Sequence, residues 1–217
     1  MADVSPPNYT LTFLRHGESV GNLEKRHQGH ADFPLTEKGR AQARALAERW
    51  KAEGRSFDRA FSSPLLRARQ TAEIVCSFLG IPLEFDPDLK EIDNGLLAGR
   101  NDEEAADLLI RPELMTTYTR FGKTGESRWQ VYLRAGRMVQ KLIDTSPGKT
   151  LVVAHGGILN MTMYAILGIP LQANFSGSRF LFKNTTFATF TYEPARHIWR
   201  LHQFDDRAHL NAAEGME

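Results

Sequence analysis

Two histidines in this sequence stand directly after short apolar runs, and each is followed by glycine. The runs are Tyr9–Leu14, which leads into Arg15-His16-Gly17, and Thr150–Ala154, which leads into His155-Gly156-Gly157. A neutral imidazole is a nucleophile that can form a covalent phosphoryl intermediate, and a guanidinium group binds phosphate oxygens. These residue types therefore suit phosphoryl transfer, provided that the fold brings the histidines together and supplies a separate acid for the leaving oxygen.

The rest of the chain alternates short β-prone runs with helical runs, which predicts an α/β fold: a three-layer α/β/α sandwich with a mostly parallel central sheet. Ligands of such sheets bind beyond the carboxyl ends of the strands, so both His-Gly pairs point to one site. Thr36 is placed to cap a helix that Gly54 ends. We expect strands near residues 9–14, 57–61, 83–85, 150–154, 185–192 and 197–204, and helices near residues 36–54, 65–79, 103–114, 127–143 and 158–167.

The predicted helices at residues 103–114 and 127–143 have no strand pattern between them. A chain of 217 residues is of the length expected for one domain that carries an insertion. We therefore expect a single domain, residues 1–217, with a helical cap-like insertion at about 92–149.

Composition excludes several classes of protein. Hydrophobic residues make up 41% of the chain and charged residues 24%, which is ordinary for a folded globular protein and not for a mainly disordered one. A net charge of +1 gives no overall attraction to nucleic acid or to an anionic membrane. Cys76 is the single cysteine, so the chain forms no internal disulfide and no multi-cysteine zinc site. No apolar run approaches the ~20 residues of a membrane span, and Met1–Pro7 lacks a signal-peptide core, so we expect a soluble, cytoplasmic protein. Oligomeric state stays open.

Six motifs, in order along the chain, resemble those of the histidine phosphatase superfamily, also called the phosphoglycerate mutase-like family. The first contains Arg15-His16-Gly17 and the last contains His155-Gly156-Gly157. An Arg-His-Gly tripeptide alone would be a weak signal, whereas six ordered motifs over nearly the whole chain are specific. They are Arg15–Asn22, Gln28–Gly39, Ser62–Ala72, Leu89–Gly99, Gly125–Arg134 and Val152–Gly157.

The resemblance implies a role for each matching residue. His16 would be the phosphorylated nucleophile, and Glu91 would protonate the leaving alcohol and later help to activate water. Asp93 is the alternative to Glu91, because the position of the acid varies within the superfamily. Glu126 and Arg134 match a motif too, but we expect them to form a structural ion pair.

The remaining matching residues would hold the phosphoryl group. Arg15 and Arg67 would clamp its oxygens, and His155 would complete the pocket and stabilise charge in the transition state. Asn22 and Gly156 would also bind phosphate or substrate, although Asn22 could instead fix the loop.

The resemblance implies a phosphomonoesterase that acts on a small phosphorylated metabolite without a metal ion or an organic cofactor. Consistently, the sequence has no His-x-His pattern and no metalloprotease-type zinc motif. The first alternative is phosphoryl transfer of the phosphoglycerate mutase type. Residues 97–127 lack the arginine-rich segment of those mutases. The second alternative is a non-catalytic module that binds a phosphorylated ligand.

Overall fold

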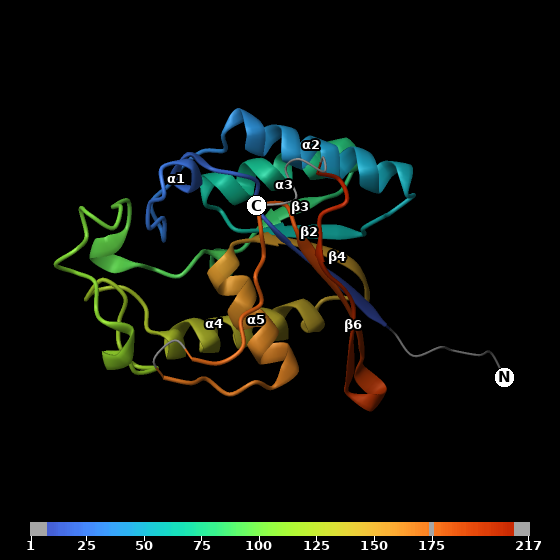
Figure 1. The fold of residues 1–217 in the computed structure, drawn as a ribbon. Coiled ribbons are helices and arrows are strands. Elements are labelled where there is room, and N and C mark those ends of the chain that lie inside the picture. The colour runs from blue at the N-terminus through green and yellow to red at the C-terminus, as the bar shows by residue number, and fades with distance from the viewer. Residues whose placement is uncertain (1–7, 174–175, 211–217) are drawn as a thin grey trace.

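The computed structural model describes residues 8–173 and 176–210. Its centre is a sheet of six strands in the order β3-β2-β4-β1-β5-β6 (Figure 1). The first four strands are mutually parallel, whereas β5 is antiparallel to β1 and to β6. The strands are β1 (Tyr9–Arg15), β2 (Arg59–Ser62), β3 (Leu83–Phe85), β4 (Gly148–Ala154), β5 (Phe187–Glu193) and β6 (Ile198–Asp206).

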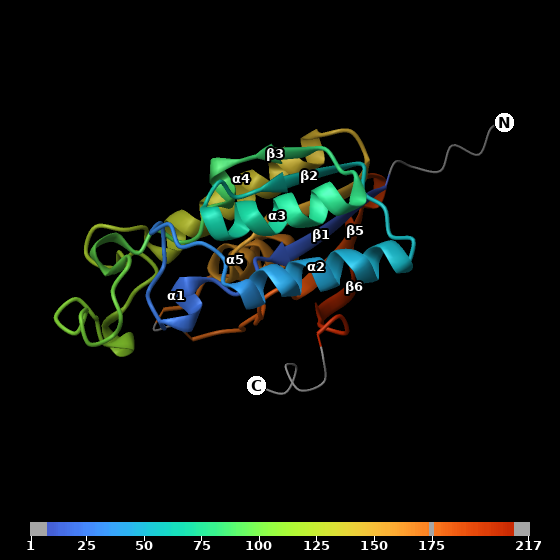
Figure 2. The same ribbon diagram turned by 90° about the horizontal axis from the view of Figure 1, so that it is seen from above.

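Both faces of the sheet are covered by helices, which confirms the predicted three-layer fold. Figures 1 and 2 show α2 (Glu37–Ala52) and α3 (Leu66–Leu79) on one face, and α4 (Arg128–Asp144) and α5 (Gly156–Leu167) on the other. The short helix α1 spans Val20–Leu23.

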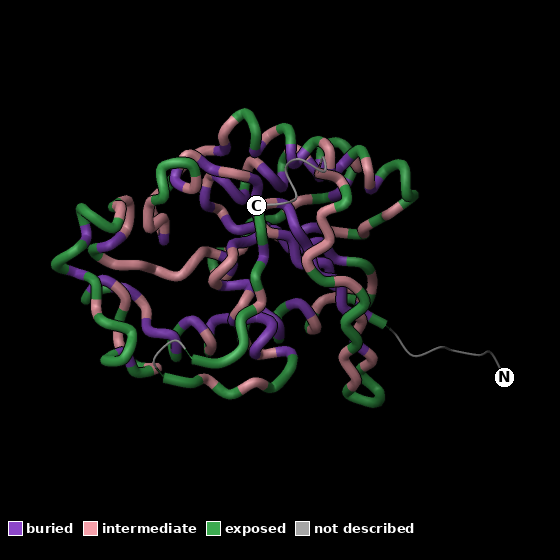
Figure 3. The backbone as a smooth tube through the Cα atoms, in the orientation of Figure 1, coloured by how far each residue is buried: buried purple, intermediate pink, exposed green. Residues whose placement is uncertain are grey.

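Apolar side chains alternate between two cores because successive residues of a strand face opposite sides of the sheet. In β1, Phe13 packs into the core between the sheet and helices α4 and α5, while Leu14 packs into the core with Trp50 of α2. The central strands β1 and β4 are therefore buried on both sides, as is usual for parallel strands, and Figure 3 shows the buried residues concentrated there.

Most predicted elements are present with small shifts at their ends. Thr36 caps α2 as expected, since its Oγ1 accepts a hydrogen bond from the Gly39 amide over 3.0 Å. The two C-terminal strands form a hairpin whose turn is a 3₁₀ segment, Pro194–Arg196.

The prediction of a helix over residues 103–114 is wrong. That stretch consists of turns and one 3₁₀ segment, Pro112–Leu114. Helices shorter than ~12–15 residues need a packed face to be stable, and Leu97, Ala105 and Leu108 form only a small apolar cluster there. Pro112 would in addition break the hydrogen-bond ladder of a helix.

The other predicted helix of the insertion is α4, which lies in the main layers and packs against α5. Residues 92–127, called the cap segment below, extend away from the layers as the green chain in Figures 1 and 2. The role of this segment as a cap stays a prediction.

Two glycines set how closely the loop after β1 approaches the start of α2. A Cβ atom on Gly17 would lie 2.5 Å from the carbonyl oxygen of Gly39, and a Cβ on Gly39 would collide with the carbonyl oxygen of Glu18. Both carbonyl oxygens belong to the backbone. Space for either added methyl group would therefore require a shift of the loop that carries His16 or of the start of α2.

We predict that Gly39→Ala destabilises the fold by about 1–3 kcal/mol, because the added methyl group overpacks a backbone contact. The control is Gly136→Ala in α4, where a Cβ meets no atom within 4 Å. Alanine there should be neutral or stabilising by up to ~1 kcal/mol, from its better helix propensity. Urea unfolding measures both changes. Equal stabilities of the two variants would contradict this account of the loop.

Candidate active site

The carboxyl ends of the adjacent strands β1 and β4 place His16 and His155 side by side. The register pairs Arg15 with Ala154, so the next residue of each strand is a histidine. Their rings lie with centroids 5.1 Å apart, and both side chains are buried.

The hydrogen bonds of His16 leave one ring nitrogen with a lone pair. Nδ1 lies 2.7 Å from the carbonyl oxygen of Gly17, and because a carbonyl oxygen only accepts, Nδ1 must carry the hydrogen. Nε2 is then unprotonated in the neutral ring. Burial, followed by the charges of Arg15 and Arg67, holds the pKa of His16 well below its usual value. His16 is therefore a neutral imidazole at neutral pH.

His155 is oriented by Ser63, a residue that the sequence analysis did not single out. The Nε2 atom of His155 lies 2.8 Å from Ser63 Oγ, and the same oxygen accepts a hydrogen bond from the Leu65 amide. Burial is the largest cause that lowers the pKa of His155 well below its usual value, followed by the charge of Arg67. The Nδ1 atom is buried without a partner.

Arg15 and Arg67 each donate to backbone carbonyl oxygens and retain one buried nitrogen without a partner. Arg15 Nη1 donates to Phe182 O over 2.6 Å. Arg67 donates to Gly29 O over 2.8 Å and to Ala31 O over 3.0 Å. Burial lowers the pKa of Arg67 to about 10, so the group is still cationic at neutral pH.

Buried N–H groups normally have partners, so unpartnered ones indicate a place for a ligand. In the part of the chain that the structure describes, six buried side-chain N or O atoms lack a partner. Three of them belong to groups around His16, and two are on cationic side chains. They are Arg15 Nε, Arg67 Nε and His155 Nδ1.

A cavity of about 230 Å³, the inner pocket, lies beside His16 and the side chains of Arg15 and Arg67. Its lining includes Arg15, His16, Arg67 and Glu91. Two guanidinium groups and a neutral imidazole nitrogen around one small space make it a site for a compact anion such as a phosphoryl group.

Glu91 is held by the first turn of α5. Its carboxylate accepts hydrogen bonds from the amides of Gly157 over 3.0 Å, Ile158 over 2.9 Å and its own neighbour Ile92 over 2.9 Å. The first N–H groups of a helix have no partner within the helix, and the helix dipole favours a negative group there. Position 157 has to be small, since a Cβ there would lie 2.5 Å from Glu91 Oε1.

Arg134 fixes the segment that carries Glu91 from the other side. It forms an ion pair of 2.6 Å with Glu126, and it donates to the carbonyl oxygens of Asp88, Lys90 and Glu91. The expected structural ion pair is thus present, and it also positions the candidate acid.

The alternative acid, Asp93, is not among the described residues that line the pockets at the histidines. Its Oδ1 accepts a hydrogen bond from the Gly95 amide over 2.8 Å and so shapes a turn of the cap segment. This geometry favours Glu91 over Asp93.

Asn22 is also absent from the described lining of these pockets. Its Oδ1 accepts hydrogen bonds from the amide and hydroxyl of Ser19 and so closes the N-terminal cap of α1. Binding of substrate by Asn22 stays a prediction. The side-chain amide of Asn184 contacts Asn22 Oδ1 and also donates to His16 O over 3.0 Å.

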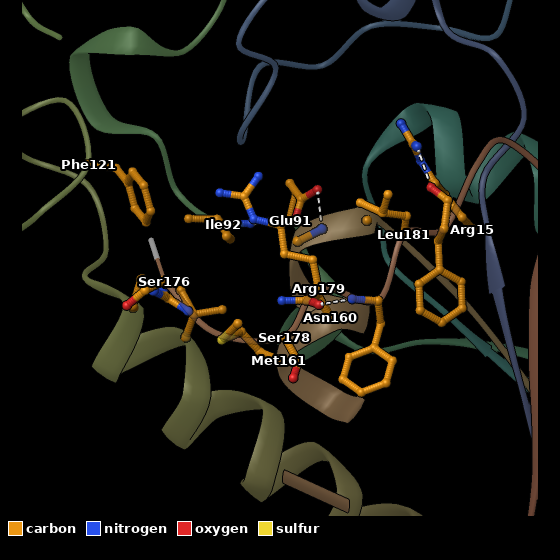
Figure 4. Close-up of a pocket in the computed structure, with 16 residues that line it drawn as sticks. Arg15, Glu91, Ile92, Phe121, Asn160, Met161, Ser176, Ser178, Arg179 and Leu181 are labelled. Carbon is orange, nitrogen blue, oxygen red and sulfur yellow. Dashed lines mark hydrogen bonds between the residues drawn. The ribbon is translucent and has the colours of Figure 1, made fainter. Parts of the chain in front are cut away.

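A second cavity of about 370 Å³, the outer pocket, adjoins the inner one and shares Arg15, Glu91 and Ile92 with it (Figure 4). Gly156 lines this outer pocket. Half of the side chains in its described lining are apolar, and Arg128 and Arg179 add positive charge.

One wall of the outer pocket comes from residues 176–182, a segment that the sequence analysis did not assign to the site. Figure 4 shows Ser176, Ser178, Arg179 and Leu181 around the cavity. Asn160 of α5 fixes this wall, because its Oδ1 accepts a hydrogen bond from the Phe180 amide over 2.8 Å. The segment has no regular secondary structure, so no periodicity pointed to it.

Residues 8–173 and 176–210 contain no group of three or more His, Cys, Asp or Glu side chains placed to hold a metal ion. In the same ranges, every helix is too short or too polar to cross a membrane.

Comparisons with known proteins agree with this geometry. The chain is 33% identical to a probable phosphoglycerate mutase, GpmB, of Cronobacter sakazakii, over 210 residues that cover 92% of this chain and 94% of that protein. Among solved structures, Bacillus stearothermophilus YhfR superposes with a TM-score of 0.79 and 31% identity, covering 93% of this chain and 98% of the other. The mycobacterial glucosyl-3-phosphoglycerate phosphatase Rv2419c superposes with a TM-score of 0.77 and 28% identity, covering 92% and 100%.

A sequence model of the histidine phosphatase superfamily (branch 1) matches residues 11–207, which is nearly the whole described chain. The match begins in β1 and ends just after β6, so it includes every strand and helix that positions the two histidines. The chain therefore belongs to branch 1 of the histidine phosphatase superfamily.

Proposed function

We propose that this protein is a phosphatase that hydrolyses monoesters of small phosphorylated metabolites through a phosphohistidine on His16. The observation that carries the proposal is the neutral His16 ring beside three unpartnered buried nitrogens, two of them on guanidinium groups. The names of the similar structures, which include a phosphatase, support the same reaction class.

In the first step, the anionic substrate binds together with a proton, which Glu91 holds. His16 Nε2 then attacks the phosphorus atom, the ester P–O bond breaks, and Glu91 gives this proton to the departing oxygen. Arg15, Arg67 and His155 would hold the three other oxygens, because phosphoryl transfer depends mainly on positioning and charge stabilisation. In the second step, water attacks the phosphohistidine, Glu91 takes up its proton, and phosphate leaves with His16 regenerated.

The proposal includes no metal ion and no organic cofactor, because the guanidinium groups supply the positive charge that the phosphoryl oxygens need. We further propose that the chain is one domain and that the cap segment covers the site. We also propose that the enzyme acts in the cytoplasm. The cytoplasm is a reducing compartment, and the single cysteine of the chain, Cys76, is buried and unpaired.

Phosphoglycerate mutase activity is the second candidate, because the similar GpmB proteins carry that name. A mutase returns the phosphoryl group to a bound sugar acid instead of to water. Assays of hydrolysis and of mutase activity with a bisphosphate activator separate the two candidates, and we expect hydrolysis to dominate.

We predict that His16→Ala lowers phosphatase activity by about 10⁴- to 10⁶-fold while the circular dichroism spectrum is unchanged, because the variant has no nucleophile. The matched control is His202→Ala, since His202 is exposed on β6, lies 2.8 Å from Thr191 Oγ1 and is not among the described residues that line the two pockets. Its activity should equal that of the wild type. Substantial turnover by the His16 variant would contradict the covalent route.

We predict that Glu91→Gln slows phosphorylation of the enzyme by an alkyl phosphate about 10²- to 10⁴-fold, but affects p-nitrophenyl phosphate far less. An alkoxide needs a proton to leave, whereas nitrophenolate does not. Rapid-quench measurement of the first turnover isolates this step. Asp93→Asn serves as the control and should show no such selectivity. A selective loss in the Asp93 variant instead would assign the acid to Asp93.

We predict that the free energy of unfolding decreases as the pH falls from about 7 to 5. The unfolded chain takes up protons on histidine near pH 6.5, whereas the folded protein keeps His16 and His155 neutral, so protons favour unfolding. His209, with its pKa lowered by burial to about 4, acts in the same direction. Urea unfolding at several pH values should give a slope that is smaller in His16→Ala by up to ~1.4 kcal/mol per pH unit. An unchanged slope would mean that His16 binds protons equally well in the folded and unfolded states.

A further inference from the structure

The cap segment encloses a further cavity of about 470 Å³, called the cap cavity, which the proposed reaction steps do not use. Its size lies within the range of ~300–1,000 Å³ found for small-molecule sites. Apolar side chains form most of its lining: Leu97, Leu108, Leu109, Ile110, Pro112 and Met115.

The cap cavity adjoins both pockets of the active site. Phe121 lines the cap cavity and the outer pocket, and Asn94 lines the cap cavity and the inner pocket. A leaving group in the outer pocket therefore lies against the same ring that bounds the cap cavity. Figure 4 shows Phe121 at the side of the outer pocket that faces the cap segment.

Backbone hydrogen bonds fix the turn that carries Phe121. Its amide donates to Glu126 O and its carbonyl oxygen accepts from Gly125 N, both over 2.9 Å. The turn is also tied to the preceding part of the cap segment, because the Leu96 amide donates to Gly122 O over 3.1 Å. Phe121 thus has a fixed backbone position at the border of the two apolar spaces.

Two of the four polar side chains that line the cap cavity have protein partners, and a third, Arg111, is exposed. His27 Nε2 lies 2.7 Å from Asp102 Oδ1, and Arg120 donates to the carbonyl oxygens of Thr124 and Gly125. The chemistry that the cavity offers to a ligand is therefore mainly apolar contact.

We propose that the cap cavity binds the distal apolar part of the leaving group, while the phosphoryl group lies in the inner pocket. This inference rests on the proposed function and narrows its substrate class. The substrates are phosphate monoesters of amphipathic alcohols that carry an apolar chain or ring several atoms from the ester oxygen. A short, fully polar leaving group would fill the outer pocket and leave the apolar cavity unused.

Alkylphosphonates of increasing chain length test the proposal without turnover, because their C–P bond has no ester oxygen to lose. Calorimetry would compare methyl-, butyl-, hexyl- and octylphosphonate. Burying one CH₂ group is worth about 0.8 kcal/mol, which is about a four-fold gain in affinity. We expect a two- to four-fold gain per CH₂ group once the chain is long enough to pass Phe121.

Two leucines of the cap segment give a matched pair of variants. Leu109 lines the cap cavity and is 45% exposed, so Leu109→Trp should fill the cavity without disturbing a buried core. Leu114 is 67% exposed and is not among the described lining residues, so Leu114→Trp adds the same bulk elsewhere. The chain-length gain should disappear in Leu109→Trp and persist in Leu114→Trp, with methylphosphonate bound equally by both.

The outcomes separate this proposal from the function on which it rests. Methylphosphonate binding without any chain-length gain, or a gain that survives Leu109→Trp, overturns the cap-cavity proposal alone. If no phosphonate binds and no phosphate ester is hydrolysed, the proposed function fails, and this inference fails with it.

Discussion

The ends of β1 and β4 bury two imidazole rings beside two guanidinium groups. The other parts of the site depend on this cluster of four buried side chains. Burial disfavours the charged form of every ionisable side chain, but its effect on the protonation state differs between histidine and arginine. His16 and His155 lose their protons, whereas Arg67 remains cationic even with its pKa lowered to about 10. The positive charge therefore resides on the arginines, and the His16 ring stays neutral beside them.

Backbone atoms hold this arrangement in place more than side-chain charges do. Carbonyl oxygens of Gly29, Ala31 and Phe182 orient the two guanidinium groups, and the amides of α5 orient Glu91. These oxygens carry only partial charge, so they position the arginines without neutralising them. An incoming phosphoryl dianion would supply the missing charge and the missing hydrogen-bond partners together.

The sequence predicted those elements whose formation depends on local pattern. The apolar runs of β1 and β4 identified the central strands, and Thr36 identified the start of α2, because alternation and capping are encoded within a few residues. The helix expected over residues 103–114 was wrong because helical periodicity alone does not guarantee a packed face.

The contacts in the site that the sequence analysis did not predict join residues that are distant in the sequence. Ser63 meets His155 across 92 positions, and Arg134 reaches the segment of Glu91 across 43. The wall at residues 176–182 is irregular chain whose place follows from Asn160, not from any pattern of its own. Such contacts become visible only when the strands are in register.

The stereochemical course at phosphorus tests the covalent route most directly, because it does not require the intermediate to accumulate. Each in-line displacement at phosphorus inverts its configuration, and the proposed reaction has two of them, first by His16 and then by water. A phosphate ester made chiral at phosphorus with the three oxygen isotopes, with its phosphoryl group transferred by the enzyme to an acceptor alcohol in place of water, gives a product ester whose configuration can be read. The account predicts overall retention. Inversion would mean a single direct displacement by water, and it would contradict the assignment of His16 as the nucleophile.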